Sequence, residues 1–459
     1  MGLKKTGKKR STGAASFYQI AWRWHFYAGL IFMPILVLLA VTGAIYLFKP
    51  QIEESMYDKL YHVKAEGEKM SPTKQIEAVK EAYPNSELTR YRPGEGKERS
   101  AEIGFSQDEE TYTAYVNPYT GQVLGRMKDE TKFMNRVEEI HGELMAGTIG
   151  DRIVELTACW GIVLIVTGIY LWWPRMPKRF SGVVIPRLTK GKRLLIRDLH
   201  VVPAFWVSAG MLFLILTGLP WSGLWGNEFQ KFATNTGEGY PPSVWVGEKP
   251  TSQIKTEEVA DVPWAAEKMV VPTSDQSSFL KLSIDDVVRI ANEQKVHPAY
   301  QVYIPQTADG VYTLSVFPPK AQDEATVHLD QYTGAILADY RYDQYGWVGK
   351  TIALGITLHK GTEFGLANQL AGLLVCAGIV GIVISGFLLW LNRKPNGSLG
   401  APKAPTKGRL KWFVLLLVGL GIIFPLVGLS LIIVLLMDLF IIQRIPRLKR
   451  LLGAKNKGE

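Results

Sequence analysis

The sequence predicts an internally duplicated α-helical membrane bundle. We expect four core transmembrane helices and a C-terminal apolar helix, with two small α+β domains outside the cytoplasm. Three observations predict this fold class. Long uncharged apolar runs alternate with polar stretches, although charged residues make up 20% of the chain. Basic residues cluster beside the apolar runs, and the two halves of the chain repeat each other.

Four apolar runs are long enough to cross a bilayer as helices, namely 26–48, 153–173, 201–221 and 366–391. About 20 apolar residues span the hydrocarbon core, where only internally hydrogen-bonded backbone is tolerated. A fifth run, 412–440, contains Pro425. The first run exceeds the usual length of a signal-peptide core and no A-x-A site follows it, so we expect an uncleaved anchor.

The distribution of charge predicts the topology. The net charge is +10, and basic residues cluster in the N-terminal tail and in the segments after the second and fourth runs. Cytoplasmic loops carry this bias, so anionic lipid headgroups rather than nucleic acid are the expected partners. Segments 49–134 and 227–355 are then outside. For the last run, a single crossing and a re-entrant or interfacial helix both remain open.

The predicted segments follow in chain order. They are a basic cytoplasmic tail (1–16), a first membrane helix (17–48), an outer domain (49–134), a second membrane helix (135–174), a cytoplasmic loop (175–198), a third membrane helix (199–226), a second outer domain (227–355), a fourth membrane helix (356–392), a cytoplasmic loop (393–411), the C-terminal apolar helix (412–442) and a basic tail (443–459).

The membrane helices form a parallel repeat. The first and third share a histidine and a Thr-Gly pair at the same spacing, His25 with Thr42-Gly43 and His200 with Thr217-Gly218. The second and fourth align without a gap, matching His141 with His359, Gly168 with Gly386, and Trp172 with Trp390. Both halves enter the membrane in the same sense.

The outer segments repeat as well. Each contains a Tyr-Thr-Gly sequence, at Tyr119 and at Tyr332, that predicts a tight turn between two strands, with glycine at φ > 0. Amphipathic stretches at 72–83 and 284–294 predict one helix in each domain, and runs 111–116 and 311–317 predict strands. Each outer domain is therefore expected to be a small helix-plus-antiparallel-sheet module.

Four of the seven histidines occupy the predicted first turns of the membrane helices: His25, His141, His200 and His359. The topology pairs His25 with His200 at the cytoplasmic face and His141 with His359 at the outer face. Paired imidazoles in a helix bundle suit the axial ligation of haem iron. Zinc fits less well, because two histidines leave a structural site unclosed, and a proton relay is another option. His62, His297 and His328 lack matching partners.

Nearby residues allow two interpretations each. Ala28, Gly29, Gly43, Gly210 and Gly218 could make room for a macrocycle or permit close helix packing. Arg23 and Arg197 could meet haem propionates or simply obey the positive-inside rule. Cys159 and Cys376 lie in apolar runs and form no disulfide or zinc pattern.

Two segments, RDLHVVPAFWVSAGMLFLILTGLPWSGLWG and HGELMAGTIGDRIVELTACWGIVLIVTGIYLWWPR, resemble the bacterial PepSY-associated transmembrane family. That family includes iron-regulated membrane proteins and ferric-siderophore reductases, and the outer modules resemble PepSY domains. The resemblance covers about residues 17–393. The first helix departs from it, because WRWHFYAG places the arginine and both tryptophans before His25.

The resemblance implies a multi-pass electron-transfer protein of the bacterial inner or plasma membrane, with its N-terminus in the cytoplasm. Two b-type haems would be held by His25, His200, His141 and His359 as axial ligands, and a ferric chelate (siderophore) would be reduced at the outer face. A quinol or a redox protein would donate electrons, because no dinucleotide fingerprint follows a strand. The alternative is a haem-free PepSY membrane anchor that binds or regulates a secreted peptidase.

Overall fold

The computed structural model describes residues 12–173, 182, 184–189, 191–239, 254–274, 280–395, 398–402 and 410–453. The predictions made for the N-terminal tail up to residue 11, for most of the loop 175–190, for 403–409 and for 454–459 lie outside the described residues. The chain divides into two compact units. The membrane unit comprises Met1–Ala44, Ile140–Trp225 and Ala371–Glu459, and the sheet unit comprises Ile45–Glu139 and Gly226–Leu370.

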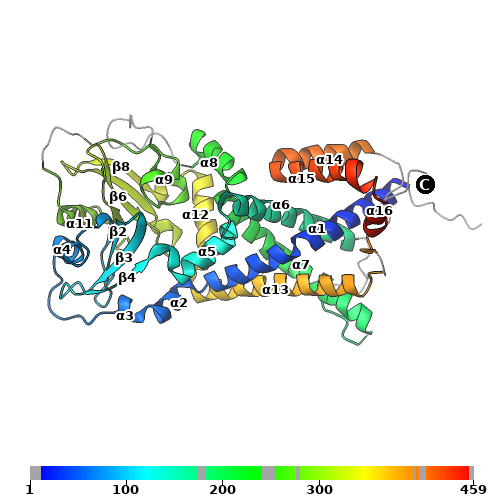
Figure 1. The fold of residues 1–459 in the computed structure, drawn as a ribbon, viewed down its shortest axis with the longest axis horizontal. Coiled ribbons are helices and arrows are strands. Elements are labelled where there is room, and N and C mark those ends of the chain that lie inside the picture. The colour runs from blue at the N-terminus through cyan, green and yellow to red at the C-terminus, as the bar shows by residue number, and fades with distance from the viewer. Residues whose placement is uncertain are drawn as a thin grey trace, which may run out of the picture. The chain divides into compact units, whose positions relative to one another are not determined.

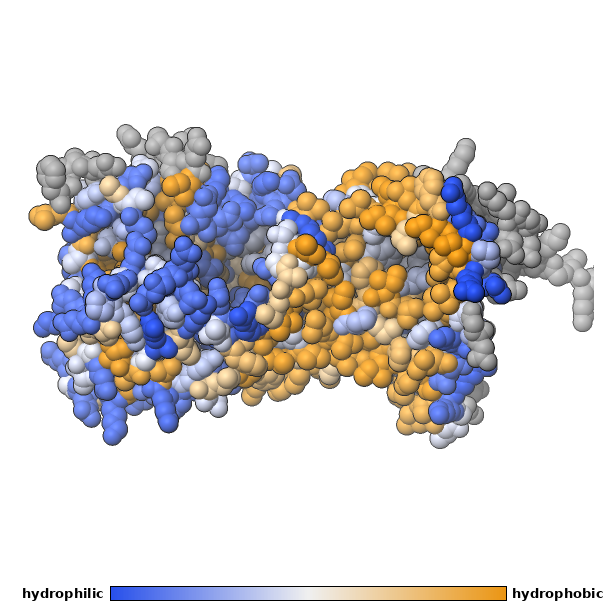
Figure 2. All heavy atoms as spheres, in the orientation of Figure 1, coloured by the Kyte–Doolittle hydropathy of each residue, from blue (hydrophilic) through white to orange (hydrophobic). Residues whose placement is uncertain are grey.

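The core of the membrane unit contains four long helices: α1 (Thr12–Tyr46), α6 (Gly147–Trp172), α7 (Lys192–Gly218) and α13 (Leu366–Leu391). A helix of 26 residues, such as α6, is about 39 Å long and exceeds the hydrocarbon thickness of about 30 Å. Among the described residues, five helices are long and apolar enough to cross a membrane, the fifth being Pro425–Ile442. Figure 2 shows a largely hydrophobic surface over these helices.

Small residues let the membrane helices approach closely. A Cβ atom on Gly210 of α7 would lie 2.5 Å from a methyl group of Val375 on α13, and one on Gly378 of α13 would lie equally close to Val207. These reciprocal contacts show that Gly210 serves helix packing rather than room for a macrocycle. Ala28 is likewise buried in a packed cluster around Trp160, which also contains Phe32.

The C-terminal apolar run forms a helical hairpin in the membrane unit. The helix α14 (Leu410–Ile423) ends just before Pro425, which begins α15 (Pro425–Met437). The helix α14 is about 21 Å long, shorter than the hydrocarbon core of about 30 Å, whereas α15 continues through a π-helical segment to Ile442 as an 18-residue candidate span. The two helices lie side by side in Figure 1 and approach most closely where a Cβ on Gly428 would be 2.6 Å from the Cα of Gly421. This geometry favours the re-entrant alternative over a single straight crossing.

Hydrogen bonds fix the turn of this hairpin and the segments that flank it. The Trp225 indole donates to the Ile423 carbonyl at 3.0 Å, which satisfies a carbonyl freed by the helix break. Beyond α15, a short π-helical segment (Asp438–Ile442) leads to α16 (Pro446–Leu452), which ends at Gly453 in the left-handed conformation. Arg23 of α1 donates to the carbonyls of Pro402 and Gly453. The end of α16 therefore lies beside Arg23, in the first half of α1.

The sheet unit is built on one eight-stranded antiparallel sheet. Its strands are β1 (Glu87–Arg92), β2 (Ala101–Gln107), β3 (Glu110–Val116), β4 (Val123–Lys128), β5 (Gln301–Tyr303), β6 (Val311–Val316), β7 (Ala325–Asp330) and β8 (Ile336–Arg341), in the order β4-β3-β2-β1-β5-β6-β7-β8. The repeats join where Arg90 and Tyr91 of β1 pair with Tyr303 and Val302 of β5. The two outer modules are thus halves of one sheet rather than separate small domains.

One face of the sheet is covered by the two predicted helices, α4 (Pro72–Ala82) and α11 (Ile284–Glu293). Alternate strand residues such as Ile103 and Leu314 share one hydrophobic core with Val79 and Val287 of these helices. The repeats also meet through a polar contact, because Asp285 accepts hydrogen bonds from the backbone and hydroxyl of Thr73 at 3.0 and 2.7 Å.

The two Tyr-Thr-Gly turns are confirmed. Gly121 and Gly334 have φ of 71° and 73° in the β3–β4 and β7–β8 hairpins. Shorter helices complete the described chain: α2 (Lys49–Met56), α3 (Asp58–Tyr61), α5 (Phe133–Glu143), α8 (Trp225–Asn235), α9 (Thr256–Val259), α10 (Trp264–Glu267) and α12 (Trp347–His359). In the sheet unit, α8, α10 and α12 enclose a second hydrophobic core against β8.

Candidate functional site

Two of the four predicted histidines face each other inside the membrane unit. The imidazole rings of His25 on α1 and His200 on α7 have centroids 6.4 Å apart and planes 76° apart. Neither residue lies in the first turn of its helix as expected, because α1 and α7 begin well before the apolar runs, at Thr12 and Lys192. The pair that the repeat predicted for one membrane face is nevertheless brought together.

The separation of these rings suits two ligands on opposite sides of one metal ion. A metal–imidazole bond is about 2.0 Å long, and the ring centre lies about 1 Å behind the bonding nitrogen. Two such rings therefore have centres about 6 Å apart. The near-perpendicular planes are compatible with this arrangement, because each ring can rotate about its own metal–nitrogen axis.

Hydrogen bonding sets the tautomer of His200. Its Nδ1 lies 2.9 Å from the backbone carbonyl oxygen of Ile382 on α13, with the Ser385 hydroxyl at 3.5 Å. A carbonyl can only accept, so Nδ1 carries the proton and donates. The Nε2 atom then keeps a free lone pair, which is the state that a metal-binding imidazole requires.

The tautomer of His25 is set by a hydroxyl group that behaves as an acceptor. The Nδ1 atom lies 3.1 Å from Oγ1 of Thr167 on α6. That hydroxyl donates its own proton to the Val163 carbonyl at 2.6 Å, one helical turn earlier. Thr167 therefore accepts from Nδ1–H, and Nε2 of His25 is also left as an electron-pair donor.

His141 is held in the same way at the other end of α1. Its Nδ1 lies 2.9 Å from Oγ1 of Thr42, which donates to the Leu38 carbonyl at 2.8 Å. At about 1.5 Å per residue, Thr42 lies about 25 Å further along α1 than His25. The membrane unit therefore carries two imidazole positions separated by most of the hydrocarbon thickness.

Glycine provides the space for each of these rings. A Cβ atom would lie 3.1 Å from His25 Cε1 if added to Gly168, 3.2 Å from His141 Cε1 if added to Gly43, and 3.0 Å from His200 Cε1 if added to Gly386. Each glycine directly follows a hydroxyl residue: Thr167, Thr42 or Ser385. A two-residue cradle of hydroxyl and glycine thus seats the Nδ1–Cε1 edge of each imidazole, and for His25 and His200 it leaves the Nε2 edge available.

His141 and His359 do not begin membrane helices, which corrects the expectation from the sequence. His141 lies near the end of α5, and Leu144, Met145 and Gly147 have positive φ before α6 begins. His359 is the last residue of α12, and α13 follows after two glycines with positive φ, at positions 361 and 365. His141 belongs to the membrane unit and His359 to the sheet unit, so the pairing of these two stays a prediction.

The two arginines near the inner pair have protein partners. Arg23 donates to the carbonyl of Pro402, to the carbonyl of Gly453 at the end of α16, and to the Tyr27 hydroxyl. Arg197 lies 3.6 Å from the carboxylate of Asp198, which also binds Arg187. These contacts give both side chains structural roles near the ends of α1 and α7.

The other three histidines contact protein groups in the sheet unit. His62 lies between Glu54 and Asp58 at 2.7 and 2.9 Å, and His297 accepts from the backbone of Ala299 at 3.2 Å. His328 is 0% exposed, and burial lowers its pKa to about 3, so it is neutral and contacts Thr313 through Nδ1 at 3.0 Å. Over the described residues, no group of three or more His, Cys, Asp or Glu side chains could hold a metal ion.

A buried carboxylate was missed by the sequence analysis. Glu155 lies in α6 and is 1% exposed. It accepts from the backbone N–H groups of Leu224 and Trp225 at 2.9 and 3.2 Å, and Arg152 lies 3.8 Å away. A single acidic residue inside an apolar run was the available signal. Its contacts show that it holds the chain at Leu224 and Trp225 against α6 within the membrane unit.

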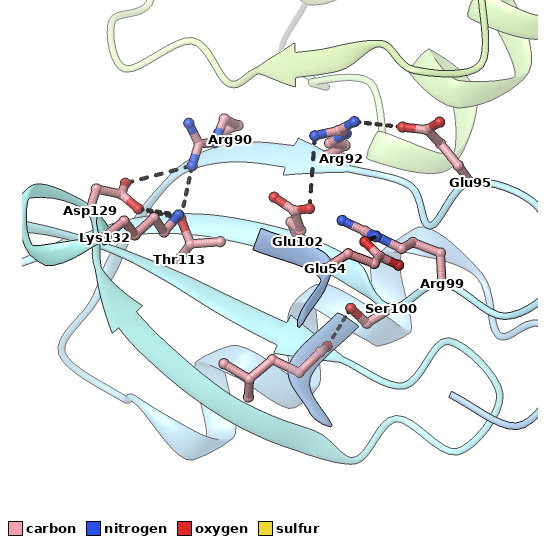
Figure 3. A network of polar contacts seen from close by, with 11 residues as sticks. Glu54, Arg90, Arg92, Glu95, Arg99, Ser100, Glu102, Thr113, Asp129 and Lys132 are labelled. Carbon is pink, nitrogen blue, oxygen red and sulfur yellow. Dashed lines mark hydrogen bonds and ion pairs between the residues drawn. The ribbon is translucent and has the colours of Figure 1, made fainter. Parts of the chain in front are cut away.

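The polar face of the first repeat's sheet is occupied by paired charges (Figure 3). Arg92 bridges Glu95 and Glu102, at 2.5 and 3.8 Å, while Lys132 lies 2.7 Å from Asp129. Arg90 reaches Asp129 at 3.6 Å, and Arg99 reaches Glu54 at 2.8 Å. Because opposite charges alternate across this face, the network stabilises the sheet and forms no patch of one sign.

Comparison with known proteins identifies the family. No curated protein matches the chain. A family model described as the PepSY-associated TM region matches residues 22–393, which is well over half of the sequence and includes all four predicted histidine ligands. The match and the apolar helices agree on a multi-pass membrane protein. The chain belongs to the PepSY-associated transmembrane family.

Proposed function

We propose that this protein is a haem-dependent electron-transfer protein of the bacterial inner membrane that reduces a ferric chelate at the outer face for iron acquisition. The observation that carries the proposal is the His25–His200 pair. Its rings have the separation expected of two axial ligands, and hydrogen bonds to Thr167 and Ile382 leave both Nε2 atoms available.

The residues present fit b-type haem. His25 and His200 would hold one haem, and His141 with His359 would hold a second. Bound haem supplies one-electron transfer at a potential that its axial ligands tune. The chain orients the ligands through the hydroxyl–glycine cradles and keeps water away by enclosing them among apolar helices. These are the tasks a protein performs around such a group.

The two histidine positions suit transfer across the membrane. His25 and the Thr42 partner of His141 lie about 25 Å apart along α1, so the two sites approach opposite faces. Between them, Trp160 is buried against Phe32 and Trp24 at centroid distances of 5.9 and 6.0 Å. Trp206, the other aromatic candidate, is 60% exposed and contributes less to the interior.

The distribution of basic residues supports one direction of electron transfer across the membrane. The basic segments favour a cytoplasmic N-terminus, so electrons would enter on the side of His25 and His200. The donor would be a quinol or a separate redox protein. The substrate would be Fe(III) held by hard oxygen ligands outside the membrane, and Fe(II) is released because such ligands hold it less tightly.

An absorption spectrum of the detergent-purified protein, oxidised and then dithionite-reduced, tests the proposal. We expect sharp low-spin bands and about two b-type haems per chain in a pyridine haemochrome assay. His25→Ala and His200→Ala should each remove the same haem, and His141→Ala should remove the other. Oxidation of the reduced protein by a ferric siderophore then tests the substrate class.

Two results would refute parts of this proposal. A featureless spectrum that persists after expression with added haem would exclude the electron-transfer function and favour the peptidase-binding alternative. Loss of one and the same haem in His25→Ala and His141→Ala would show that the histidines are wrongly paired.

A further inference from the structure

The indole N–H of Trp172 is a buried hydrogen-bond donor for which the described part of the chain offers no acceptor. Trp172 ends α6 and is 9% exposed, and its Nε1 has no partner among the described residues. Buried polar groups are nearly always hydrogen-bonded, so an unpartnered donor requires an explanation. The Phe205 ring, 4.9 Å away between centroids, covers the indole without offering an oxygen acceptor.

The position of Trp172 links it to the histidine pair. It lies four residues after Gly168, the glycine that seats His25, and residues at this spacing share one face of a helix. The indole therefore lies one turn beyond the His25 cradle, towards the end of the membrane unit where α1 begins.

The internal repeat provides a comparison. Trp390 is the repeat-equivalent of Trp172 and follows Gly386, which seats His200, at the same spacing. Its Nε1 donates to the Leu399 carbonyl at 2.9 Å. Two equivalent tryptophans thus flank the same histidine pair, and only one of them has its donor satisfied by the described protein.

We propose that the Trp172 indole N–H donates to a propionate carboxylate of the haem held by His25 and His200. This inference rests on the proposed function. The propionates are the anionic edge of an otherwise apolar macrocycle, and a carboxylate near a bilayer core needs donors. Arg23 and Arg197, which the sequence offered for this task, contact the end of α16 and Asp198 instead.

The test compares Trp172→Phe with Trp390→Phe, which removes the equivalent donor from the other side of the pair. The readout is the rate at which haem transfers from the purified protein to excess apomyoglobin. The release rate is followed for the haem whose absorption bands are missing in His25→Ala. Loss of a charge-assisted hydrogen bond should accelerate its release about tenfold in Trp172→Phe, while Trp390→Phe stays within about twofold of wild type.

Haem dimethyl ester separates the hydrogen bond from packing without changing the protein. The ester carbonyl is a neutral and weaker acceptor than a carboxylate, so wild type reconstituted with the ester should release it nearly as fast as Trp172→Phe releases haem, and the substitution should add little. Unchanged release from Trp172→Phe, or the same acceleration with haem and with its ester, would overturn the inference. A wild-type protein that binds no haem would instead refute the proposed function itself.

Discussion

Substituting Gly386 by alanine tests whether the glycines of α13 exist for helix packing or for the imidazole of His200. The new Cβ would lie 3.0 Å from Cε1 and 3.2 Å from Nδ1 of that ring. Carbon atoms pack favourably at about 3.5–4.0 Å, so the ring must retreat by about 0.5 Å. The ring is also held by the Ile382 carbonyl at 2.9 Å, so it cannot move without stretching that bond.

The displacement is large on the scale of metal ligation. Productive metal–ligand distances vary by only about 0.2 Å, and disturbing the groups that orient a ligand typically costs 10–100-fold in metal affinity. The backbone effect has the opposite sign, because alanine in a helix interior is more favourable than glycine by about 1 kcal/mol. Gly386→Ala should therefore stabilise α13 and weaken haem binding by at least about tenfold.

Gly381→Ala is the matched control. Gly381 lies five residues earlier on the same helix, and a Cβ there meets nothing within 4 Å. Haem content and thermal unfolding in detergent should be measured for both variants. We expect Gly381→Ala to retain two haems and Gly386→Ala to lose the one also lost in His200→Ala. Full retention of both haems by Gly386→Ala, with unchanged bands, would refute the role assigned to the cradle.

Three further substitutions probe the other contacts. Thr167→Val keeps the side-chain shape but removes the acceptor for His25 Nδ1–H, so we expect about tenfold weaker retention of the inner haem. Thr157→Val, on the same helix, removes a hydroxyl that donates to the Ile153 carbonyl and should have no such effect. Glu155→Ala removes the carboxylate that accepts from the part-buried N–H groups of Leu224 and Trp225 and should lower stability by about 1–3 kcal/mol; an unchanged melting temperature in detergent would contradict this. Burial raises the pKa of Glu324 to about 8, against partial compensation by Lys360, so the folded state binds this proton more tightly than the unfolded chain. The resulting stabilisation is complete below pH 4.5 and is lost as pH rises through 8, so Glu324→Gln should unfold at a higher temperature than wild type at pH 9 and at a similar temperature at pH 4.5; parallel pH profiles would contradict the assignment.

Local features of the fold were predictable because their physical causes are local. Apolar runs of sufficient length give membrane helices, and the Tyr-Thr-Gly turns follow from glycine at positive φ. The joining of the two outer modules was not predictable in this way. It depends on Tyr91 meeting Val302 across an edge-to-edge pairing of short strands, and hydrophobic periodicity carries no information about which edge pairs with which.

The helix break after His141 was also not predicted from the sequence. Leu144 and Met145 adopt positive φ, which non-glycine residues rarely do, and neither residue signals a turn. The corresponding break after His359 has Gly361 and Gly365 at positive φ, whereas the first half has only Gly147, the equivalent of Gly365, so the glycine signal was weaker in that half. Pro425 did signal the break between α14 and α15.

The hydroxyl–glycine pairs show why a site can be present in a sequence and still be misinterpreted. The four core helices contain Thr42-Gly43, Thr167-Gly168, Thr217-Gly218 and Ser385-Gly386. Glycine alone indicates close packing, and a hydroxyl alone has its proton taken by a carbonyl one turn earlier, as Thr42 and Thr167 show. Together they form a seat with space for a ring and an oxygen that can only accept. Such a dipeptide is too short to be specific, so it gains meaning only when a histidine from another helix lies opposite. That requirement is three-dimensional, and for His25 and His141 the structure supplies it through Thr167 and Thr42.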